Sequence, residues 1–317
     1  MEDRNEQDIS DRGAEALPGQ AEIEAGLRGN CSDRGSKALP GQAEIEAGLR
    51  GKWKKKLFTP FAKAVRTYEL IQDGDKIAVC ISGGKDSMLM AKLFQELKKH
   101  RKRDFDLVFL MMDPGYNPVN RQAAENNARR LGIPLEIFES PIFDYVYDQE
   151  KNPCYLCARM RRGYLYASAR DLGCNKIALG HHYDDVIETV LMGMLYSGQF
   201  QSMMPKLHSA NFPGMELIRP MYLVREADIR RWCAENDLRF LRCACRFTEQ
   251  SEACGAEGEN ISKRLETKRL IQELKRTNPD VESHIFKSTE NVVLDTVLSY
   301  KYRGERHHFL DDYDRES

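Results

Sequence analysis

The sequence predicts an α/β protein with a parallel sheet and a helical C-terminal extension. Apolar runs of strand length alternate with longer amphipathic stretches between residues 76 and 179, on the spacing that is typical of βαβ units. The composition agrees, because 41% hydrophobic residues in a chain of 317 can supply a sizeable core. A wholly disordered or collagen-like chain is therefore excluded. The sequence contains no run of 18 or more apolar residues, so we expect no membrane-spanning helix.

Each element follows from the pattern of its own segment. An amphipathic stretch at residues 53–71 is expected to precede the first strand. The predicted strands are residues 76–81, 106–112, 134–138, 176–179 and 217–219. The predicted helices are residues 87–100, 120–131, 157–171 and 226–235, with two more between 262 and 300 that are divided at Asn278 and Pro279.

The N-terminal part of the chain contains a tandem duplication. Residues 11–29 and 33–51 are identical at 17 of 19 positions. Two copies fall short of the three or more repeats that a solenoid needs, and each copy is rich in Gly, Glu and Ala. We therefore expect residues 1–51 to be a disordered appendage, with transient helix around AEIEAGLR and no catalytic role. The folded body is expected to span residues 52–300, and residues 301–317 are expected to be a frayed tail.

Charge and cysteine content limit the classes of function. The net charge of -1 does not establish nucleic-acid binding, and a solvated helix end is the simpler explanation for the basic clusters at 52–56 and 98–103. The N-terminus lacks the basic start and apolar stretch of a secretory signal, so the cytoplasm is the expected compartment. Nine cysteines in such a protein favour metal or sulfur chemistry over disulfides, because cytosolic thiols stay reduced.

A glycine-containing turn joins the first predicted strand to the helix that follows it. Small residues there let backbone N–H groups approach an anion, and the helix N-terminus adds partial positive charge. The candidate phosphate-binding residues are Ser82, Gly83, Gly84, Lys85, Asp86 and Ser87. An ordinary turn in which Asp86 or Ser87 caps the helix is the alternative. Asp113, at the end of the second strand, lies on the edge where parallel sheets bind nucleotides.

Two cysteines three positions apart, Cys154 and Cys157, come just before an arginine-rich helix. Nearby positive charge favours the thiolate, which is the form that binds metal. A third thiol must converge on the pair, and Cys243 and Cys245 are the downstream candidates. Four thiolates would suit structural zinc, whereas three would leave one corner of an iron–sulfur cluster open. The spacing alone leaves this choice open. Cys80, Cys174 and Cys233 are expected to be buried or incidental thiols.

The segment GHHYDD at residues 180–185 follows a strand and opens a helix. Two His and two Asp suggest a metal site, but adjacent side chains diverge and seldom all reach one ion. Capping of the helix by Asp184 is the alternative. Weaker candidates for a substrate-binding wall are Arg219, Arg225 and the loop 203–206, which packing would also explain.

Four segments in order carry a resemblance. They are SGGKDS at 82–87, PCYLCARMRRGYLY at 153–166, KIALGHHYDDVIETVLMGMLYSGQFQSMMPKL at 176–207 and LIRPMYLVREADI at 217–229. Together they resemble the tRNA 2-thiocytidine synthetase (TtcA) family of PP-loop ATP pyrophosphatases, over roughly residues 52–293. The resemblance implies a Rossmann-like parallel sheet of the PP-loop type. It also implies that the turn grips the β,γ pyrophosphate and that ATP is cleaved between the α and β phosphates to adenylate the substrate.

The resemblance further implies which cysteines hold a cofactor. In that family a CxxC pair and one downstream cysteine hold a [4Fe-4S] cluster, which implies Cys154 and Cys157 here. The downstream element is usually a second CxxC preceded by proline, whereas this chain has RCAC at 242–245. Cys243 is therefore the expected third ligand, with Cys245 as its rival.

The same resemblance implies a role for GHHYDD, because the corresponding element faces the nucleotide. Asp184 and Asp185 are accordingly assigned a catalytic role at Mg-ATP or in the transfer step. The expected cofactors are ATP, Mg2+ and the [4Fe-4S] cluster.

The expected function is ATP-dependent thiolation of a tRNA pyrimidine, with C2 of a cytidine as the favoured target. ATP would adenylate the C2 oxygen, and a sulfur nucleophile held by an open iron would then displace AMP. The expected partners are tRNA and a sulfur donor such as a cysteine desulfurase, without a membrane, and a homodimer is left open. Because RCAC at 242–245 departs from the family's second CxxC, thiolation or desulfuration of another substrate is an alternative.

Two other classes of function remain open from the sequence. One is a PP-loop ligase or amidating enzyme with a four-Cys structural zinc, which would contain no iron or acid-labile sulfide. The other is a nucleotide-sensing or RNA-binding module, which would release no AMP and pyrophosphate with any RNA.

Overall fold

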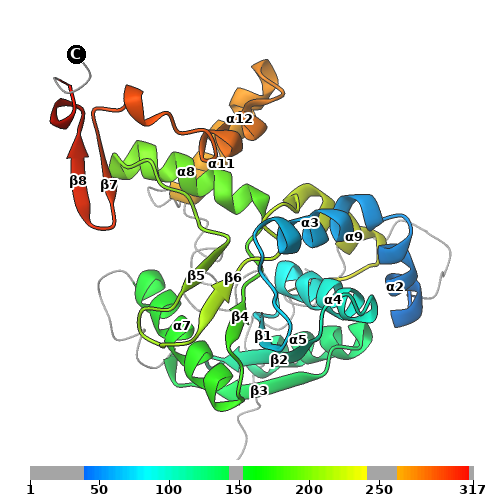
Figure 1. Cartoon of the computed structure of the whole chain (residues 1–317). Helices are drawn as coiled ribbons and strands as arrows, with labels where there is room; N and C mark the ends of the chain where they lie inside the picture. The colour runs from blue at the N-terminus through cyan, green and yellow to red at the C-terminus, as the bar shows by residue number, and fades with distance from the viewer. Residues whose placement is uncertain (1–38, 143–152, 241–262, 314–317) are drawn as a thin grey trace, which may run out of the picture. The chain divides into compact units, whose positions relative to one another are not determined.

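The computed structural model describes residues 39–142, 153–240 and 263–313, with only the backbone at residues 153–158. Within these ranges the main sheet has six strands, in the order β3-β2-β1-β4-β6-β5 (Figure 1). The strands are β1 (Asp75–Ile81), β2 (Phe105–Asp113), β3 (Leu135–Glu139), β4 (Lys176–Ala178), β5 (Lys206–His208) and β6 (Glu216–Ile218). All neighbours from β3 to β6 are parallel, and β5 pairs antiparallel with β6 at one edge. The predicted α/β class is confirmed.

The described helices agree closely with the sequence pattern in the body of the chain. They are α2 (Gln42–Arg50), the π-helix η1 (Lys54–Phe58), α3 (Thr59–Thr67), α4 (Lys85–Lys99), α5 (Pro118–Leu131), α7 (Pro153–Asp171), α8 (Tyr183–Ser197), α9 (Glu226–Glu235), α11 (Lys263–Thr277) and α12 (Val281–Ser288). Short 3-10 turns follow at η2 (Leu294–Thr296) and η3 (Phe309–Asp311). In the described ranges, none of the helices combines the length and apolarity that crossing a membrane requires.

Strand order reverses beside β1, and this position determines where a ligand can bind. The chain runs from β1 to β2 and β3 on one side, and continues with β4 and β6 on the other. Such a switch point opens a crevice outside the carboxyl ends of the two central strands. The turn after β1 and the segment after β4 both lead into that crevice.

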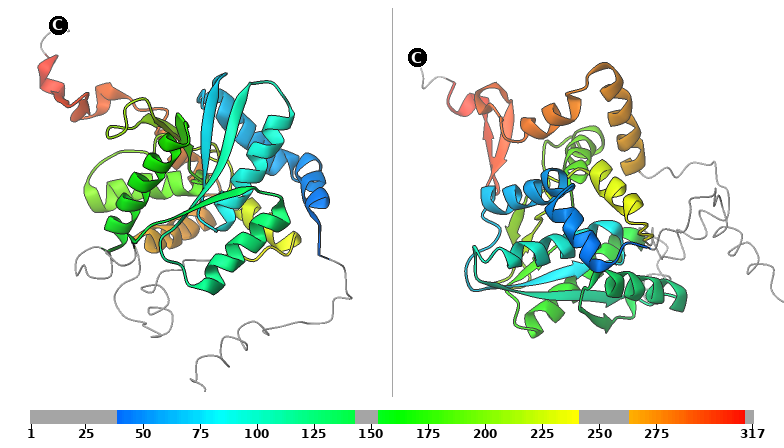
Figure 2. Two further views of the ribbon diagram at one scale, coloured as in Figure 1. Left: turned by 90° about the horizontal axis from the view of Figure 1, so that it is seen from below. Right: turned by 90° about the vertical axis from the view of Figure 1, so that its right-hand side faces the viewer.

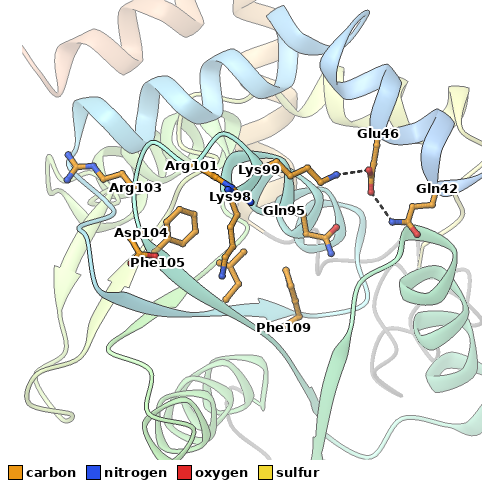
Figure 3. A pocket seen from close by; sticks show the side chains of 11 residues that line it. Gln42, Glu46, Gln95, Lys98, Lys99, Arg101, Arg103, Asp104, Phe105 and Phe109 are labelled. Atoms are coloured by element: carbon orange, nitrogen blue, oxygen red, sulfur yellow. Dashed lines mark hydrogen bonds and ion pairs between the residues drawn. The ribbon is translucent and has the colours of Figure 1, made fainter.

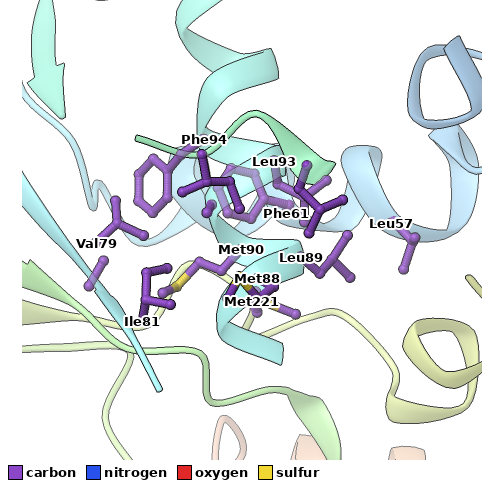
Figure 4. Close-up of a cluster of buried hydrophobic side chains, with 14 of the residues drawn as sticks. Leu57, Phe61, Val79, Ile81, Met88, Leu89, Met90, Leu93, Phe94 and Met221 are labelled. Atoms are coloured by element: carbon purple, nitrogen blue, oxygen red, sulfur yellow. The ribbon is translucent and has the colours of Figure 1, made fainter. Parts of the chain in front are cut away.

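β1 is buried on both faces because helices cover both sides of the sheet. Ile77, Val79 and Ile81 belong to one core cluster together with α3 and α4 (Figure 4). Ala78 and Cys80 point to the opposite face and pack in a second cluster with residues of α7. The near-continuous apolar run of this strand is therefore that of a central strand in a parallel sheet.

The folded body begins before the boundary that the sequence predicted at residue 51. Helix α2 lies within the second copy of the duplicated segment, and its Ile45 and Leu49 are 1% and 0% exposed within the main core cluster. A helix of nine residues is too short to be stable alone, but burial of two such side chains stabilises it by about 1.5–3 kcal/mol each. The compact unit accordingly starts at Pro40. Residues 1–38 lie outside the described residues.

The C-terminal extension is helical, as predicted, and also contains a hairpin. α11 and α12 pack on α8 (Figures 1 and 2), and Tyr183 of α8 stacks on Phe286 of α12 with ring centroids 4.6 Å apart. Beyond them β7 (Ser299–Tyr302) and β8 (Glu305–His308) pair antiparallel. The expected frayed tail from residue 301 is therefore partly β-structure.

Candidate functional site

The turn between β1 and α4 is built like an anion-binding loop. Gly83 has a φ of +77°, a conformation that favours glycine. Ser87 closes the loop, because its Oγ accepts a hydrogen bond from Ser82 N at 3.1 Å and donates one to Gly84 O at 3.0 Å. Gly84 is the N-cap of α4, and no side chain caps this helix, contrary to the alternative of a capped turn. The positive end of the α4 dipole thus faces the crevice.

The GHHYDD segment approaches this turn at very short range. A Cβ atom on Gly180 would lie 3.1 Å from Ser87 N and 3.2 Å from the carbonyl carbon of Asp86, so glycine permits the contact. The neighbouring His181 lines the same cavity as Asp86. Burial lowers the pKa of His181 to about 4, so its imidazole is neutral at physiological pH.

The two aspartates of GHHYDD accept hydrogen bonds at the N-termini of different helices. Asp185 Oδ2 accepts from His182 N at 2.9 Å in the capping box that begins α8. Asp185 Oδ1 accepts from Arg264 Nη1 at 2.7 Å. Asp184 Oδ2 accepts from Glu226 N at 2.7 Å and so caps α9 instead of its own helix. Both carboxylates are therefore fixed by hydrogen bonds close to the turn.

Lys85, the cation of the turn, lies between two carboxylates. Its Nζ is 2.9 Å from Asp86 Oδ2 and 3.3 Å from Glu226 Oε1. Burial alone would lower the pKa of Lys85, but the two carboxylates together raise it, so the ammonium stays charged. Glu226 also accepts from Arg230 Nη2 at 2.8 Å and from Lys268 Nζ. Burial would raise the pKa of Glu226, but these cations lower it to about 2.

Helix α11 contributes further charges that sequence reasoning missed. Arg264 Nη1 lies 3.3 Å from Glu188 Oε2, and Lys268 Nζ lies 4.0 Å from Glu188 Oε1. Burial raises the pKa of Glu188 even with these cations beside it. Glu226 and Arg230 were missed as well. Glu226 stands in the segment 217–229, but nothing singled it out there. Arg230 gave only the signal of a charged position on a predicted helix, which a solvated face explains equally well.

Three cavities meet at Asp86, which lines all of them. The first, of about 760 Å³, extends from the turn to Phe240. The second, of about 340 Å³, lies between the turn, Arg161 of α7 and His181. The third, of about 350 Å³, is lined by Lys268 of α11. These volumes are in the range of small-molecule sites. Asp86 Oδ1 is buried without a hydrogen-bond partner among the described residues.

Asp113 lies at the same edge of the sheet, as predicted. Its Oδ1 accepts from Gly115 N at 2.9 Å and from Tyr116 N at 2.7 Å. Arg121 Nη1 lies 3.2 Å from Asp113 Oδ2, and a cavity of about 480 Å³ opens beside them. Tyr116 also lines the second cavity at the turn, so Asp113 borders the same crevice.

The cysteines expected to bind metal fall at the limits of the described ranges. Cys154 and Cys157 occupy the first turn of α7, but their side chains lie outside the described residues. Cys243 and Cys245 lie outside them altogether. In the part of the chain that is described, no group of three or more His, Cys, Asp or Glu side chains could hold a metal ion. The thiols described are buried, as expected: Cys80, Cys174 and Cys233.

The two weaker arginine candidates are explained by packing. Arg219 is buried and donates to Met204 O, and burial lowers its pKa to about 10. Arg225 lies 4.7 Å from the ring centroid of Tyr183 and pairs with Glu282 at 2.7 Å. Burial and hydrogen bonding account for Arg219, and ion pairing and ring contact account for Arg225.

A further cavity, of about 740 Å³, opens at the opposite end of α4 (Figure 3). The 15 residues of α4 span about 22 Å, which separates this cavity from the phosphate turn. It contains part of the basic cluster 98–103, where Lys98 pairs with Asp106 at 2.8 Å and Lys99 with Glu46 at 2.6 Å. These ion pairs agree with a solvated helix end.

Comparisons with known proteins agree with this geometry. A family model described as a PP-loop domain matches residues 54–245. The chain is 35% identical over 248 residues to the tRNA-cytidine(32) 2-sulfurtransferase of Anaeromyxobacter sp. (strain K), covering 77% of this chain and 81% of the relative. It is 38% identical over 248 residues to the tRNA-cytidine(32) 2-sulfurtransferase 1 of Francisella philomiragia, covering 76% and 91%.

Among solved structures, the chain is similar to the U34-tRNA thiolase NcsA from Methanococcus maripaludis, a structure with its [4Fe-4S] cluster. The TM-score is 0.58 at 22% identity, covering 82% of this chain and 85% of that chain. At this level of identity the likeness concerns the fold alone.

Proposed function

This chain belongs to the PP-loop family and, within it, to the tRNA-cytidine(32) 2-sulfurtransferases, and on that premise we propose that it replaces the C2 oxygen of a tRNA cytidine by sulfur. In the first step the C2 oxygen attacks the α-phosphorus of ATP, the bond to the β-phosphate breaks and pyrophosphate leaves. In the second step a sulfur at the oxidation level of sulfide attacks C2, and AMP leaves with the oxygen. The adenylated cytidine that the first step forms is the substrate of the second step. The ATP site and the sulfur site must therefore open on one cavity.

Two of the three cavities that meet at Asp86 carry this proposal. The cavity toward Phe240 and the cavity toward Arg161 both open on the phosphate turn. In the sequence, Phe240 of the first cavity stands three positions before Cys243, and Arg161 of the second stands four positions after Cys157. A module that only binds a nucleotide requires one cavity at the phosphate turn, whereas a second reaction centre requires another.

The turn itself supplies the electrostatics of the first step. Lys85 and the amino end of α4 favour the negative charge that builds up on the departing pyrophosphate. Asp86 Oδ1, buried and without a hydrogen-bond partner among the described residues, is an oxygen available to hold Mg2+ with the phosphates. Burial lowers the pKa of His181, so this side chain is neutral and adds no positive charge to the second cavity.

The register of α7 supports a role for its two cysteines. Cys154 and Cys157 precede Arg161 by seven and four positions, a spacing that keeps residues on one helix face. Four residues of helix are about 6 Å long, and Arg161 lines the second cavity. Both cysteine positions therefore share the helix face that borders the crevice.

The choice of the third cysteine rests on its place in the sequence. Phe240 lines the first cavity together with Lys85. Cys243 follows Phe240 by three positions in the sequence, which supports its choice as the third ligand. Three thiolates without a fourth protein ligand suit a [4Fe-4S] cluster. When bound, such a cluster supplies an iron with an open position for the sulfur that is transferred. We assign Cys154, Cys157 and Cys243 as its ligands, with Cys245 as the alternative to Cys243.

The test is to reconstitute the full chain with iron and sulfide and incubate it with Mg-ATP, sulfide and unmodified tRNA. Nucleoside mass spectrometry is expected to detect 2-thiocytidine, with AMP and pyrophosphate released. Cys154→Ala should abolish thiolation while ATP still binds. A Cys154→Ala variant that thiolates tRNA would rule out the assigned ligand set. A sulfur donor such as a cysteine desulfurase is expected to replace free sulfide in the same assay.

The matched control is Cys174→Ala, which removes a buried thiol on the far side of the sheet from α4. It should retain both thiolation and the iron content of the wild type. Zinc in place of iron and acid-labile sulfide in the wild type would instead favour a ligase with a structural metal. Size-exclusion chromatography with light scattering would test the homodimer.

A further inference from the structure

We propose that Glu226 and Lys268 form a charge pair that controls how freely Lys85 can leave its resting contacts for the phosphates of ATP. The inference rests on the proposed function in one respect, that Lys85 binds ATP. Glu226 is the first residue of α9 and lies in the segment 217–229 that carries the resemblance, whereas Lys268 lies in α11, outside every motif that predicted the site. Both are positioning residues in this scheme, because they act through Lys85.

Glu226 is a buried carboxylate with an unusual number of cationic partners. It is 8% exposed. Its Oε1 accepts from Arg230 and lies 3.3 Å from Lys85 Nζ, while its Oε2 accepts from Lys268. Lys85 is therefore paired with a carboxylate that two other cations also stabilise.

Binding of a phosphate must weaken the contact between Lys85 and Glu226. A buried carboxylate that loses a cation is destabilised unless other charges compensate for it. Lys268 and Arg230 provide that compensation and remain in place when Lys85 turns to the ligand. Arg230 is 63% exposed at its side chain and so is screened by water, whereas Lys268 is 31% exposed. Lys268 is thus the stronger of the two compensating charges.

Lys268 also lies near a second carboxylate, Glu188. Arg264 and Lys268 are four positions apart on one face of α11, and both face Glu188 of α8. The Glu188 side chain is 5% exposed, so this anchor is buried. The C-terminal extension therefore contributes a cation, Lys268, that lies between two buried carboxylates in the cavity beside Lys85.

This arrangement predicts changes of opposite sign from two substitutions. Lys268→Met removes one of the cations that stabilise Glu226, so the attraction between Glu226 and Lys85 becomes stronger. ATP should then bind about tenfold more weakly. Glu226→Gln removes the competing carboxylate and one negative charge near the phosphates, so ATP should bind several-fold more tightly, about threefold or more. A purely structural role would make both variants bind more weakly.

The experiment is isothermal titration of the full chain with Mg-ATP, in the absence of tRNA. The double variant Glu226→Gln/Lys268→Met should bind ATP as tightly as Glu226→Gln alone, about threefold or more above the wild type, because the charge that Lys268 compensates is gone. Lys268→Arg keeps the positive charge and should restore most of the affinity that Lys268→Met loses. Unfolding midpoints measured on the same samples identify any variant that loses structure, and the double variant then still tests the coupling.

The matched control is Arg269→Met, which removes an exposed cation from the same helix and should leave ATP affinity unchanged. The inference is overturned if both single variants shift affinity in the same direction, or if neither shifts it. A wild-type chain that binds no ATP would overturn the proposed function itself. A chain that binds ATP but thiolates no tRNA leaves the pair of Glu226 and Lys268 intact.

Discussion

Asp184 Oδ2 accepts a hydrogen bond from Glu226 N at 2.7 Å, so an aspartate from the GHHYDD segment caps helix α9. The bond joins the segment after β4 to the helix that holds Lys85 in place through Glu226. A residue singled out for chemistry therefore also fixes the geometry around the phosphate turn.

This contact predicts the effect of removing the cap. Asp184→Ala should lower the free energy of unfolding by about 1 kcal/mol, the usual cost of losing a side-chain cap. Asp184→Asn retains an oxygen that can accept from Glu226 N and should cost less. Urea denaturation of the two variants checks this. Equal midpoints for Asp184→Ala and the wild type would show that the cap contributes nothing, and a loss of activity in Asp184→Asn without a loss of stability would point to a direct chemical role.

The close approach of Gly180 to the turn predicts a second effect. Gly180→Ala places a methyl group 3.1 Å from Ser87 N, so the turn or the segment must move. Overpacking of this kind costs about 1–3 kcal/mol, and ATP affinity should fall with it. Gly163→Ala is the control, because Gly163 lies within α7 and a Cβ there meets no atom within 4 Å. It should be neutral or stabilising. Normal ATP binding by Gly180→Ala would show that the turn tolerates displacement.

The buried face of α2 predicts that the second copy of the duplication is part of the fold. Leu49 is fully buried, so Leu49→Ala should cost about 2–5 kcal/mol of stability. Leu27 is the corresponding residue of the first copy, and Leu27→Ala is expected to have no measurable effect. Thermal and urea unfolding of the two variants compare them directly. Similar losses would mean that both copies contribute to the folded body.

Glu46 predicts a dependence of stability on pH. It accepts from Lys92 Nζ at 2.8 Å and from Lys99 Nζ at 2.6 Å. Burial would raise the pKa of Glu46, but these bonds lower it from 4.5 to about 2. Because the pKa is lower in the folded state, the stabilisation is fully present above about pH 4.5 and is lost as the pH falls toward 2.

The comparison is between the wild type and Glu46→Gln. At pH 7 the variant should be less stable by about 1–3 kcal/mol, the value of hydrogen bonds to charged groups. The difference should narrow steadily below pH 4.5. Free energies of unfolding measured from pH 7 down to pH 3 test this, and a gap that does not change with pH would mean that the carboxylate charge is unimportant.

Much of the site was predictable from the sequence because its residues are close together along the chain. The turn at 82–87 is one strand end and one helix start, so six consecutive residues define it. Asp113 follows from the same logic at the end of β2. The domain boundary predicted at residue 51 was wrong, because α2 before it belongs to the folded body. A short polar helix gives a weak signal, and only its contacts with the core show that Ile45 and Leu49 are buried.

What the sequence alone determined was the family, the alternation of strands and helices, and the candidate residues of each local motif. The strand order and the convergence of α9 and α11 on Lys85 depended on tertiary structure. Glu226 and Lys268 are 42 residues apart and meet at one carboxylate, yet each in isolation is an ordinary charged residue on a helix. Their function arises from burial and from distance, and both are properties of the folded chain that no local pattern of residues contains.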